Sequence, residues 1–198
     1  MRLLSLKIGW LSGKKFKYYI LGSKSLNSSF IILTFNFLFQ FFTYDVVSLY
    51  LVMDEFYKEA LKEAKKGLKE GGIPIGSVLV FNGQILGQGH NKRVQEGSCV
   101  LHGEMDALEN AGRQPASVYQ NSVIYTTLSP CPMCTGAILL YGIPKVIVGE
   151  NQNFLGAEDH LRNNGVEVEV IQDPATIQMM RQFIEEKPEL WNEDIGVD

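Results

Sequence analysis

The sequence predicts an α/β protein with a mixed, partly parallel sheet that is covered by helices on both faces. Two observations lead to this prediction. Beyond residue 53, stretches with helical periodicity alternate with short apolar stretches, and the turn-forming pair Asn82-Gly83 separates two of the apolar stretches. The composition agrees, because 198 residues with 45% hydrophobic and 20% charged side chains suit one globular domain with a substantial core.

The first helix is predicted to begin after Asp54, an N-cap followed by acidic residues in the first turn, and to end at Gly71-Gly72. One face of this helix collects its apolar residues. These are Phe56, Ala60, Leu61, Ala64 and Leu68.

Five strands and three further helices follow this first helix. The strands are expected at residues 75–81, 84–89, 122–128, 146–149 and 166–171, and the helices at 102–111, 131–141 and 176–186. Asn82-Gly83 joins the first two strands as a hairpin. The later strands are separated by helices, which favours parallel pairing and a sheet covered on both faces.

Two short motifs supply the residues of a metal site. His102-Gly103-Glu104 and Pro130-Cys131-Pro132-Met133-Cys134 each begin one of the predicted helices. Zinc binds neutral imidazole and thiolates in a tetrahedron, and a site with three protein ligands keeps its fourth position for water. Water bound to zinc loses a proton near neutral pH. We therefore predict one Zn²⁺ per subunit, held by His102, Cys131 and Cys134.

Glu104 lies two residues beyond His102, close enough to take a proton from that water and deliver it to a leaving nitrogen. Gly103 has no side chain, so a flat ring could approach the backbone there. Cys131 and Cys134 stand at a helix start, where the helix dipole favours thiolates.

The two cysteines of this motif could instead form a redox pair or half of a closed structural zinc site. Cys99 could be the fourth ligand of such a closed site, and His90 or His160 could compete for the metal. The simpler interpretation makes Cys99 a small buried side chain and His90 a structural residue. Three cysteines form no disulfide framework and suit a reducing compartment.

Residues 1–52 differ from the rest of the chain. They carry six basic side chains against one acid, which leaves residues 53–198 with a formal charge of −9 within a total of −4. The run FIILTFNFLFQFF at 30–42 is short for a membrane span. We expect residues 1–52 to be a hydrophobic, basic extension, either a non-functional leader or a product of gene prediction, with weak membrane anchoring as the alternative. The catalytic domain would then begin at Met53 and extend over 53–198.

H-x-E followed by P-C-x-x-C is typical of zinc-dependent nucleobase deaminases. Residues from about 54 onward resemble the fungal cytosine deaminases, a branch of the cytidine deaminase-like superfamily. The stretches that carry the resemblance are GIPIGSVLV (72–80), GHN (89–91), LHGEM (101–105), TTLSPCPMCTGAI (126–138), VGENQNF (148–154) and WNEDIG (191–196).

The resemblance implies a three-layer α/β/α sandwich with a mixed five-stranded sheet, an intracellular homodimer, and a site built from named residues. Asn91 and the Gly103 N–H would hold the pyrimidine carbonyl, while Asp194 and the Ser129 carbonyl would receive the exocyclic amino group. Ile75, Phe154 and Trp191 would enclose the base. Without the resemblance, Asn91 could equally be a turn residue and Asp194 a solvated acid near the chain end.

The predicted function is therefore hydrolytic deamination of free cytosine to uracil and ammonia by a zinc-activated hydroxide, with Glu104 as proton shuttle, in pyrimidine salvage. The substrate would be cytosine or a close analogue, with no nucleic acid or membrane as partner of the catalytic domain. The cytoplasm is the expected compartment, with the nucleus as a second. Alternatives are a tRNA adenosine deaminase, which the acidic charge disfavours, a nucleoside deaminase, and a closed zinc module.

Overall fold

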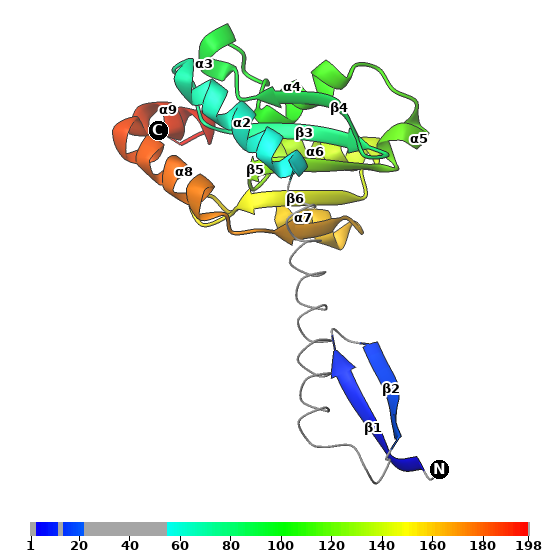
Figure 1. Cartoon of the computed structure of the whole chain (residues 1–198). Helices are drawn as coiled ribbons and strands as arrows, with labels where there is room; N and C mark the ends of the chain where they lie inside the picture. Colours follow the sequence, from blue (N-terminus) through cyan, green and yellow to red (C-terminus); the bar gives the residue numbers. More distant parts are fainter. Residues whose placement is uncertain (1–2, 12–13, 22–54, 198) are drawn as a thin grey trace. The chain divides into compact units, whose positions relative to one another are not determined.

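The structure is a computed structural model that describes residues 3–11, 14–21 and 55–197. The chain divides into two compact units, Met1–Tyr50 and Leu51–Asp198. In the first unit, β1 (Leu3–Leu11) and β2 (Lys14–Leu21) pair as an antiparallel ribbon (Figure 1). The apolar run at 30–42, the proposed start at Met53 and the predicted Asp54 cap lie outside the described residues.

The second unit is built on one five-stranded sheet (Figure 1). Its strands are β3 (Gly76–Phe81), β4 (Gln84–His90), β5 (Ser122–Leu128), β6 (Lys145–Glu150) and β7 (Glu167–Val170), in the spatial order β4-β3-β5-β6-β7. β3 is antiparallel to β4 and β5, whereas β5, β6 and β7 run parallel. Asn82 and Gly83 have φ values of 49° and 73°, as the predicted hairpin requires. The mixed five-stranded sheet is confirmed.

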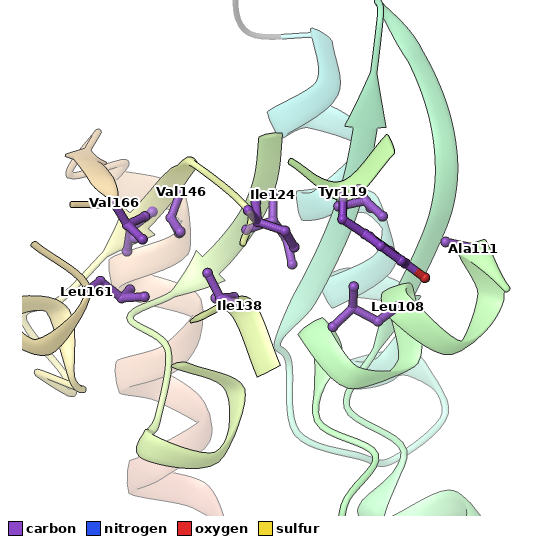
Figure 2. Packing of buried hydrophobic residues seen from close by; sticks show 11 residues of the cluster. Leu108, Ala111, Tyr119, Ile124, Ile138, Val146, Leu161 and Val166 are labelled. Atoms are coloured by element: carbon purple, nitrogen blue, oxygen red, sulfur yellow. The ribbon is translucent and has the colours of Figure 1, made fainter. Parts of the chain in front are cut away.

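Helices cover both faces of this sheet because its strands alternate apolar side chains between the faces. On one face, Val78 and Tyr125 pack with Tyr57 and Ala60 of α2 (Glu55–Lys69). The other face carries Leu79, Ile124 and their neighbours against α4 (Gly103–Ala111), α5 (Ala116–Tyr119), α6 (Pro132–Tyr141) and α7 (Glu158–Asn163). Figure 2 shows Ile124 in this cluster with Leu108, Tyr119, Ile138 and Leu161 from these helices. Each fully buried Ile or Leu of this core contributes about 1.5–3 kcal/mol.

A third apolar cluster lies beneath the C-terminal helices α8 (Pro174–Glu186) and α9 (Pro188–Asp194). Met180 and Phe183 of α8 and Trp191 of α9 pack there with Ile75 and Leu128. The cluster thus joins the C-terminal helices to residues beside the starts of α4 and α6.

The predicted inward face of α2 needs a correction. Leu68 is exposed, and the buried residues of this helix include Tyr57, Glu63 and Gly67 in its place. The physical reason is the set of polar contacts made by Glu63. Its carboxylate accepts a hydrogen bond from Gln88, and it is hydrogen-bonded to Nδ1 of buried His90. A polar contact at the sheet therefore sets the rotation of the helix, and His90 is structural, as predicted.

The long predicted elements are present within one or two residues of their expected bounds. Four short helices were not predicted: α3 (Arg93–Glu96), α5, α7 and α9. Their lengths of four to seven residues give too few turns for hydrophobic periodicity to be detected. In the described part of the chain, no helix combines the length and hydropathy needed to cross a membrane.

Candidate active site

The two metal motifs meet because each stands at the N-terminus of a helix on the same face of the sheet. His102 is the N-cap of α4 and Cys131 the N-cap of α6, both with extended backbone and neither with a side-chain capping bond. Their side chains are therefore left for another use. Cys134 follows in the first turn of α6 and is buried. Both helix dipoles favour negative charge at this point.

The ligand atoms of His102, Cys131 and Cys134 lie within 4.8 Å of one another. The Cys131 Sγ is 3.5 Å from the His102 Nδ1. Zinc bonds of about 2.3 Å to sulfur and 2.0–2.1 Å to nitrogen at a tetrahedral angle place these two atoms about 3.6 Å apart. The spacing and the donor set fit zinc, with Nδ1 as the imidazole ligand.

Cys99 does not complete a four-ligand site. It is exposed and lies outside the cluster, so the prediction that it is a buried side chain was wrong. His90 is held by Glu63 and Glu70, and His160 is exposed on α7. Among the described residues, the cluster therefore has three ligands, the number typical of a catalytic zinc site.

The cysteines of the cluster differ in proton affinity. A hydrogen bond from Cys134, with a further contribution from His102, lowers the pKa of Cys131 to about 4. The same hydrogen bond, together with burial, raises the pKa of Cys134 well above its ordinary value. Without metal the two sulfurs share one proton, and zinc binding would displace that proton because thiolates are the ligands.

Glu104 lies on the first turn of α4, buried beside the cluster. Burial raises the pKa of its carboxyl group, and the neighbouring Cys131 thiolate raises it further. The Thr126 hydroxyl donates to Glu104 Oε1 at 3.0 Å. Glu104 is thus a fixed carboxyl group with an increased tendency to hold a proton, which suits a general acid and base.

A small pocket, of at most about 300 Å³, lies against the cluster. Its lining includes residues of the metal site, the predicted walls and the third apolar cluster: Ile75, His102, Glu104, Leu128, Ser129, Cys131, Phe154, Trp191, Asp194 and Ile195. Phe154 and Trp191 meet edge to face, with ring centroids 5.8 Å apart. The three predicted apolar walls therefore line one pocket. A larger hollow near Arg113 and Tyr119 contains none of the metal-site residues.

Asn91 and Gly103 lie behind the pocket lining. Asn91 is fully buried, and its Nδ2 donates to Asp194 Oδ1 at 2.9 Å, across 103 residues of sequence. Gly103 packs against the Ile75 backbone, where an added Cβ would lie 3.0 Å from the carbonyl oxygen. The group that closely approaches Gly103 is therefore the Ile75 backbone, where the sequence predicted the approach of a flat ring. Asp194 Oδ1 also lies 3.7 Å from His102 Nε2, so the side-chain carboxylate of Asp194 is next to one of the metal ligands.

Sequence reasoning missed three residues that surround the site. Thr126 bonds Glu104, Arg93 contacts Asp194, and buried Glu158 accepts a hydrogen bond from the Ser129 hydroxyl at 2.8 Å. No motif marks Thr126 or Glu158. Arg93 follows Asn91 by two positions within a run of consecutive polar residues, a composition common in exposed turns.

A family model described as "Cytidine and deoxycytidylate deaminase zinc-binding region" matches residues 52–150, which include all three ligands and Glu104. The chain belongs to this family of zinc-binding deaminases. It is 60% identical over 138 residues to the cytosine deaminase of Candida albicans, covering 69% of this chain and 92% of that protein. The resemblance inferred from the sequence is thereby confirmed.

A second group of relatives is named for a larger substrate. The tRNA-specific adenosine deaminase of Streptococcus pyogenes serotype M18 is 42% identical over 123 residues, 58% of this chain and 77% of that protein. Among solved structures, RibD of Acinetobacter baumannii has a TM-score of 0.53 at 27% identity, covering 68% of this chain and 39% of that one. NE0047 in complex with 2,6-diaminopurine also has a TM-score of 0.53, at 18% identity, covering 66% and 80% of the two chains. The last likeness supports the fold alone.

Proposed function

We propose that this protein is a zinc-dependent cytosine deaminase that hydrolyses free cytosine to uracil and ammonia. The observation that carries the proposal is the small pocket beside the three-ligand cluster, whose lining combines buried Glu104 and Asp194 with two aromatic walls. The 60% identity to a cytosine deaminase supports the same substrate. The small size of this pocket suits a free base better than a nucleoside or a polynucleotide.

Zinc held by His102, Cys131 and Cys134 supplies the Lewis acidity that makes water a nucleophile at neutral pH. The proton movements belong to Glu104. Its carboxylate takes a proton from the attacking water and donates it to the ring N3 as the water oxygen bonds C4. It then moves the second proton, from the hydroxyl group now on C4, to the exocyclic nitrogen, whose bond to C4 breaks to release ammonia and leave uracil. Thr126 holds Oε1 during these steps, so Oε2 is the oxygen assigned to proton transfer.

The substrate contacts follow from the groups around the pocket. Asn91 offers an N–H to the C2 carbonyl, together with the Gly103 backbone N–H. Asp194 and the Ser129 carbonyl accept from the exocyclic amino group, and Ile75, Phe154 and Trp191 enclose the ring. The Ser129 hydroxyl is occupied, since it donates to Glu158 and accepts from the Gly156 N–H, so its backbone carbonyl is the group assigned to substrate.

A substrate panel tests the proposed function. Ultraviolet absorbance of the zinc-loaded protein would be followed with cytosine, cytidine and adenosine in parallel. Conversion of cytosine alone is expected, because the pocket is small and Phe154, Trp191 and Ile195 line it. Conversion of cytidine or of adenosine, without cytosine turnover, would contradict the proposed function and favour a rival activity.

We also propose that residues 1–52 are dispensable and that residues 53–198 form the catalytic domain. The contrast in charge between the segments supports this division. Mass spectrometry of the protein isolated from its source tests it: a native N-terminus at Met53 is expected, and peptides from before Met53 would contradict the proposal. The cytoplasm, with the nucleus as a second compartment, suits a metal site built on reduced thiols.

Homodimerisation is proposed as well. Leu140 and Leu155 are 79% and 67% exposed, and the half-covered Tyr141 stacks on Tyr119 beside Leu140. Exposed apolar side chains indicate an interface only where they form one patch, so the proposal rests on the resemblance to the cytosine deaminases, and Leu140 is the residue chosen to test it. Sedimentation equilibrium should give twice the mass of the chain, and Leu140→Lys should shift the protein to the monomer. A monomeric wild-type protein would contradict the proposal.

A further inference from the structure

We propose that Arg93 is a positioning residue for substrate recognition: it orients both polar side chains assigned to the base, Asn91 and Asp194. This inference rests on the proposed cytosine deaminase function and deepens it. Arg93 is the first residue of α3, and its side chain is 14% exposed.

The backbone of Arg93 sets the orientation of the Asn91 amide. The Arg93 N–H donates to Asn91 Oδ1 at 3.0 Å. Since this oxygen is engaged, the amide presents its nitrogen on the other side, where Nδ2 donates to Asp194 at 2.9 Å. An amide nitrogen carries two N–H groups, so one remains for a ligand. Asn91 is thereby restricted to donating, which matches a carbonyl oxygen of a base.

The guanidinium of Arg93 sets the Asp194 carboxylate. Its Nη1 donates to Asp194 Oδ1 at 3.3 Å and to the Glu193 carbonyl at 3.1 Å. Oδ1 therefore accepts from Asn91 and Arg93 together. Oδ2 has no hydrogen-bonding partner among the described residues, so this oxygen is left as the acceptor for an amino group. The result is a donor and an acceptor side by side, with Asp194 in the pocket lining and Asn91 directly next to it.

These contacts do more than anchor a helix. Packing already holds α9, because Trp191 is buried in the third apolar cluster and lies edge to face with Phe154. The Nε of Arg93 is buried without a hydrogen-bonding partner among the described residues. A buried donor left unpaired costs stability, so a residue selected for stability alone would be expected to avoid it. The guanidinium is instead placed where its Nη1 reaches Asp194.

The two carboxylates that contact Arg93 differ in their exposure to solvent. The Nη2 of Arg93 lies 2.5 Å from the Glu193 carboxylate, whose side chain is 60% exposed, whereas the Asp194 side chain is only 3% exposed. Ion pairs at the surface contribute little, while hydrogen bonds to buried charges contribute more. The two contacts can therefore be separated by mutation.

The experiment compares full-length, zinc-loaded Arg93→Met, Arg93→Lys and Glu193→Gln with the wild-type protein. Met keeps the aliphatic stem and removes the guanidinium. We expect Arg93→Met to keep its zinc and to raise the KM for cytosine about 10- to 100-fold, with kcat changed less than KM. Lys should restore only part of the loss, because an ammonium lacks the planar fork. Glu193→Gln should keep KM within about twofold.

Two further measurements separate positioning from a merely structural role. Added guanidinium ion should lower the KM of Arg93→Met and leave the wild-type KM unchanged. Lys92→Met removes the neighbouring cation, whose partner is buried Asp106 at 3.0 Å, and should lower the melting temperature without raising KM. An unchanged KM in Arg93→Met would overturn the inference, as would loss of zinc or of folded protein that accounts for its defect. Absence of cytosine turnover by the wild-type protein would overturn the proposed function itself, and the inference with it.

Discussion

Replacing Thr126 by Val would test how much the proton shuttle depends on one hydroxyl group. Thr126 is fully buried on β5, pairs with Ser77 and Val148 of the neighbouring strands, and donates to Glu104 Oε1 at 3.0 Å. Valine keeps the β-branched shape, so the sheet should be retained. The variant leaves a buried carboxylate oxygen without its donor.

A hydrogen bond to a charged group contributes about 1.5–3 kcal/mol. Since about 1.4 kcal/mol corresponds to a factor of ten in rate, kcat/KM for cytosine should fall about 10- to 100-fold. The bound zinc should be unchanged, because the Thr126 hydroxyl bonds Glu104 and none of the three ligands. Thr126→Ser keeps the hydroxyl and should recover most of the activity.

The pH profile should change in a defined direction. Burial raises the pKa of Glu104, whereas the hydrogen bond from Thr126 lowers it. The carboxylate must be ionised in the free enzyme to take a proton from water, so kcat/KM falls as the pH drops through this pKa. Removing the hydroxyl raises the pKa of Glu104 further and should move the acidic limb of kcat/KM to higher pH.

The neighbouring Thr127 provides a matched control. It is equally buried, but its hydroxyl accepts from the Gly76 N–H at 3.1 Å and does not contact Glu104. Thr127→Val should therefore lower the melting temperature while the acidic limb stays in place. The reasoning would be refuted if Thr126→Val kept kcat/KM within twofold of wild type, or if both variants moved the limb equally.

Three more predictions concern the shuttle, the C-terminal helix and the number of metal ligands. Glu104→Gln should keep zinc, measured by atomic absorption, and lose about 10²–10⁴ of kcat, and an active variant would remove Glu104 as the shuttle. Deletion of the residues after Leu190 removes Trp191 and Asp194 from the pocket and should abolish turnover with zinc retained; undiminished activity would show that α9 is not needed. Cys99→Ser should bind zinc with wild-type stoichiometry, since Cys99 is exposed and outside the cluster, and loss of the metal would point to a closed four-ligand site.

Several features of the site could be predicted because they depend on short spacings in the chain. The key residues of each motif lie two or three positions apart at the start of a helix. His102 and Cys131 are the N-caps of α4 and α6, and Glu104 and Cys134 follow in the first turns. Long elements also show their periodicity directly, and the Asn82-Gly83 hairpin is marked by its turn residues. Spacing alone could not give the buried face of α2, because the contact between Glu63 and His90 sets its rotation.

The pairing of Asn91 with Asp194 is a different case, since 103 residues separate them. Neither position carries a local pattern that marks it. The resemblance to cytosine deaminases pointed to both residues, but their contact and the participation of Arg93 depend on the docking of α9. That helix has seven residues, too few to be detected from periodicity.

The sequence by itself determined the metal-binding cluster, the order of the main elements and the class of chemistry, and it predicted Glu104 as the shuttle, because metal coordination and helix starts are local properties of the chain. The tertiary structure decided the rest. Thr126 and Thr127 are adjacent and identical in kind, and only the orientation of β5 in the sheet directs one hydroxyl to Glu104 and the other to the Gly76 backbone. Packing likewise exposed Cys99, placed Trp191 and Asp194 of α9 in the pocket lining and brought Arg93 to Asp194, since contacts across the chain depend on how the elements pack together.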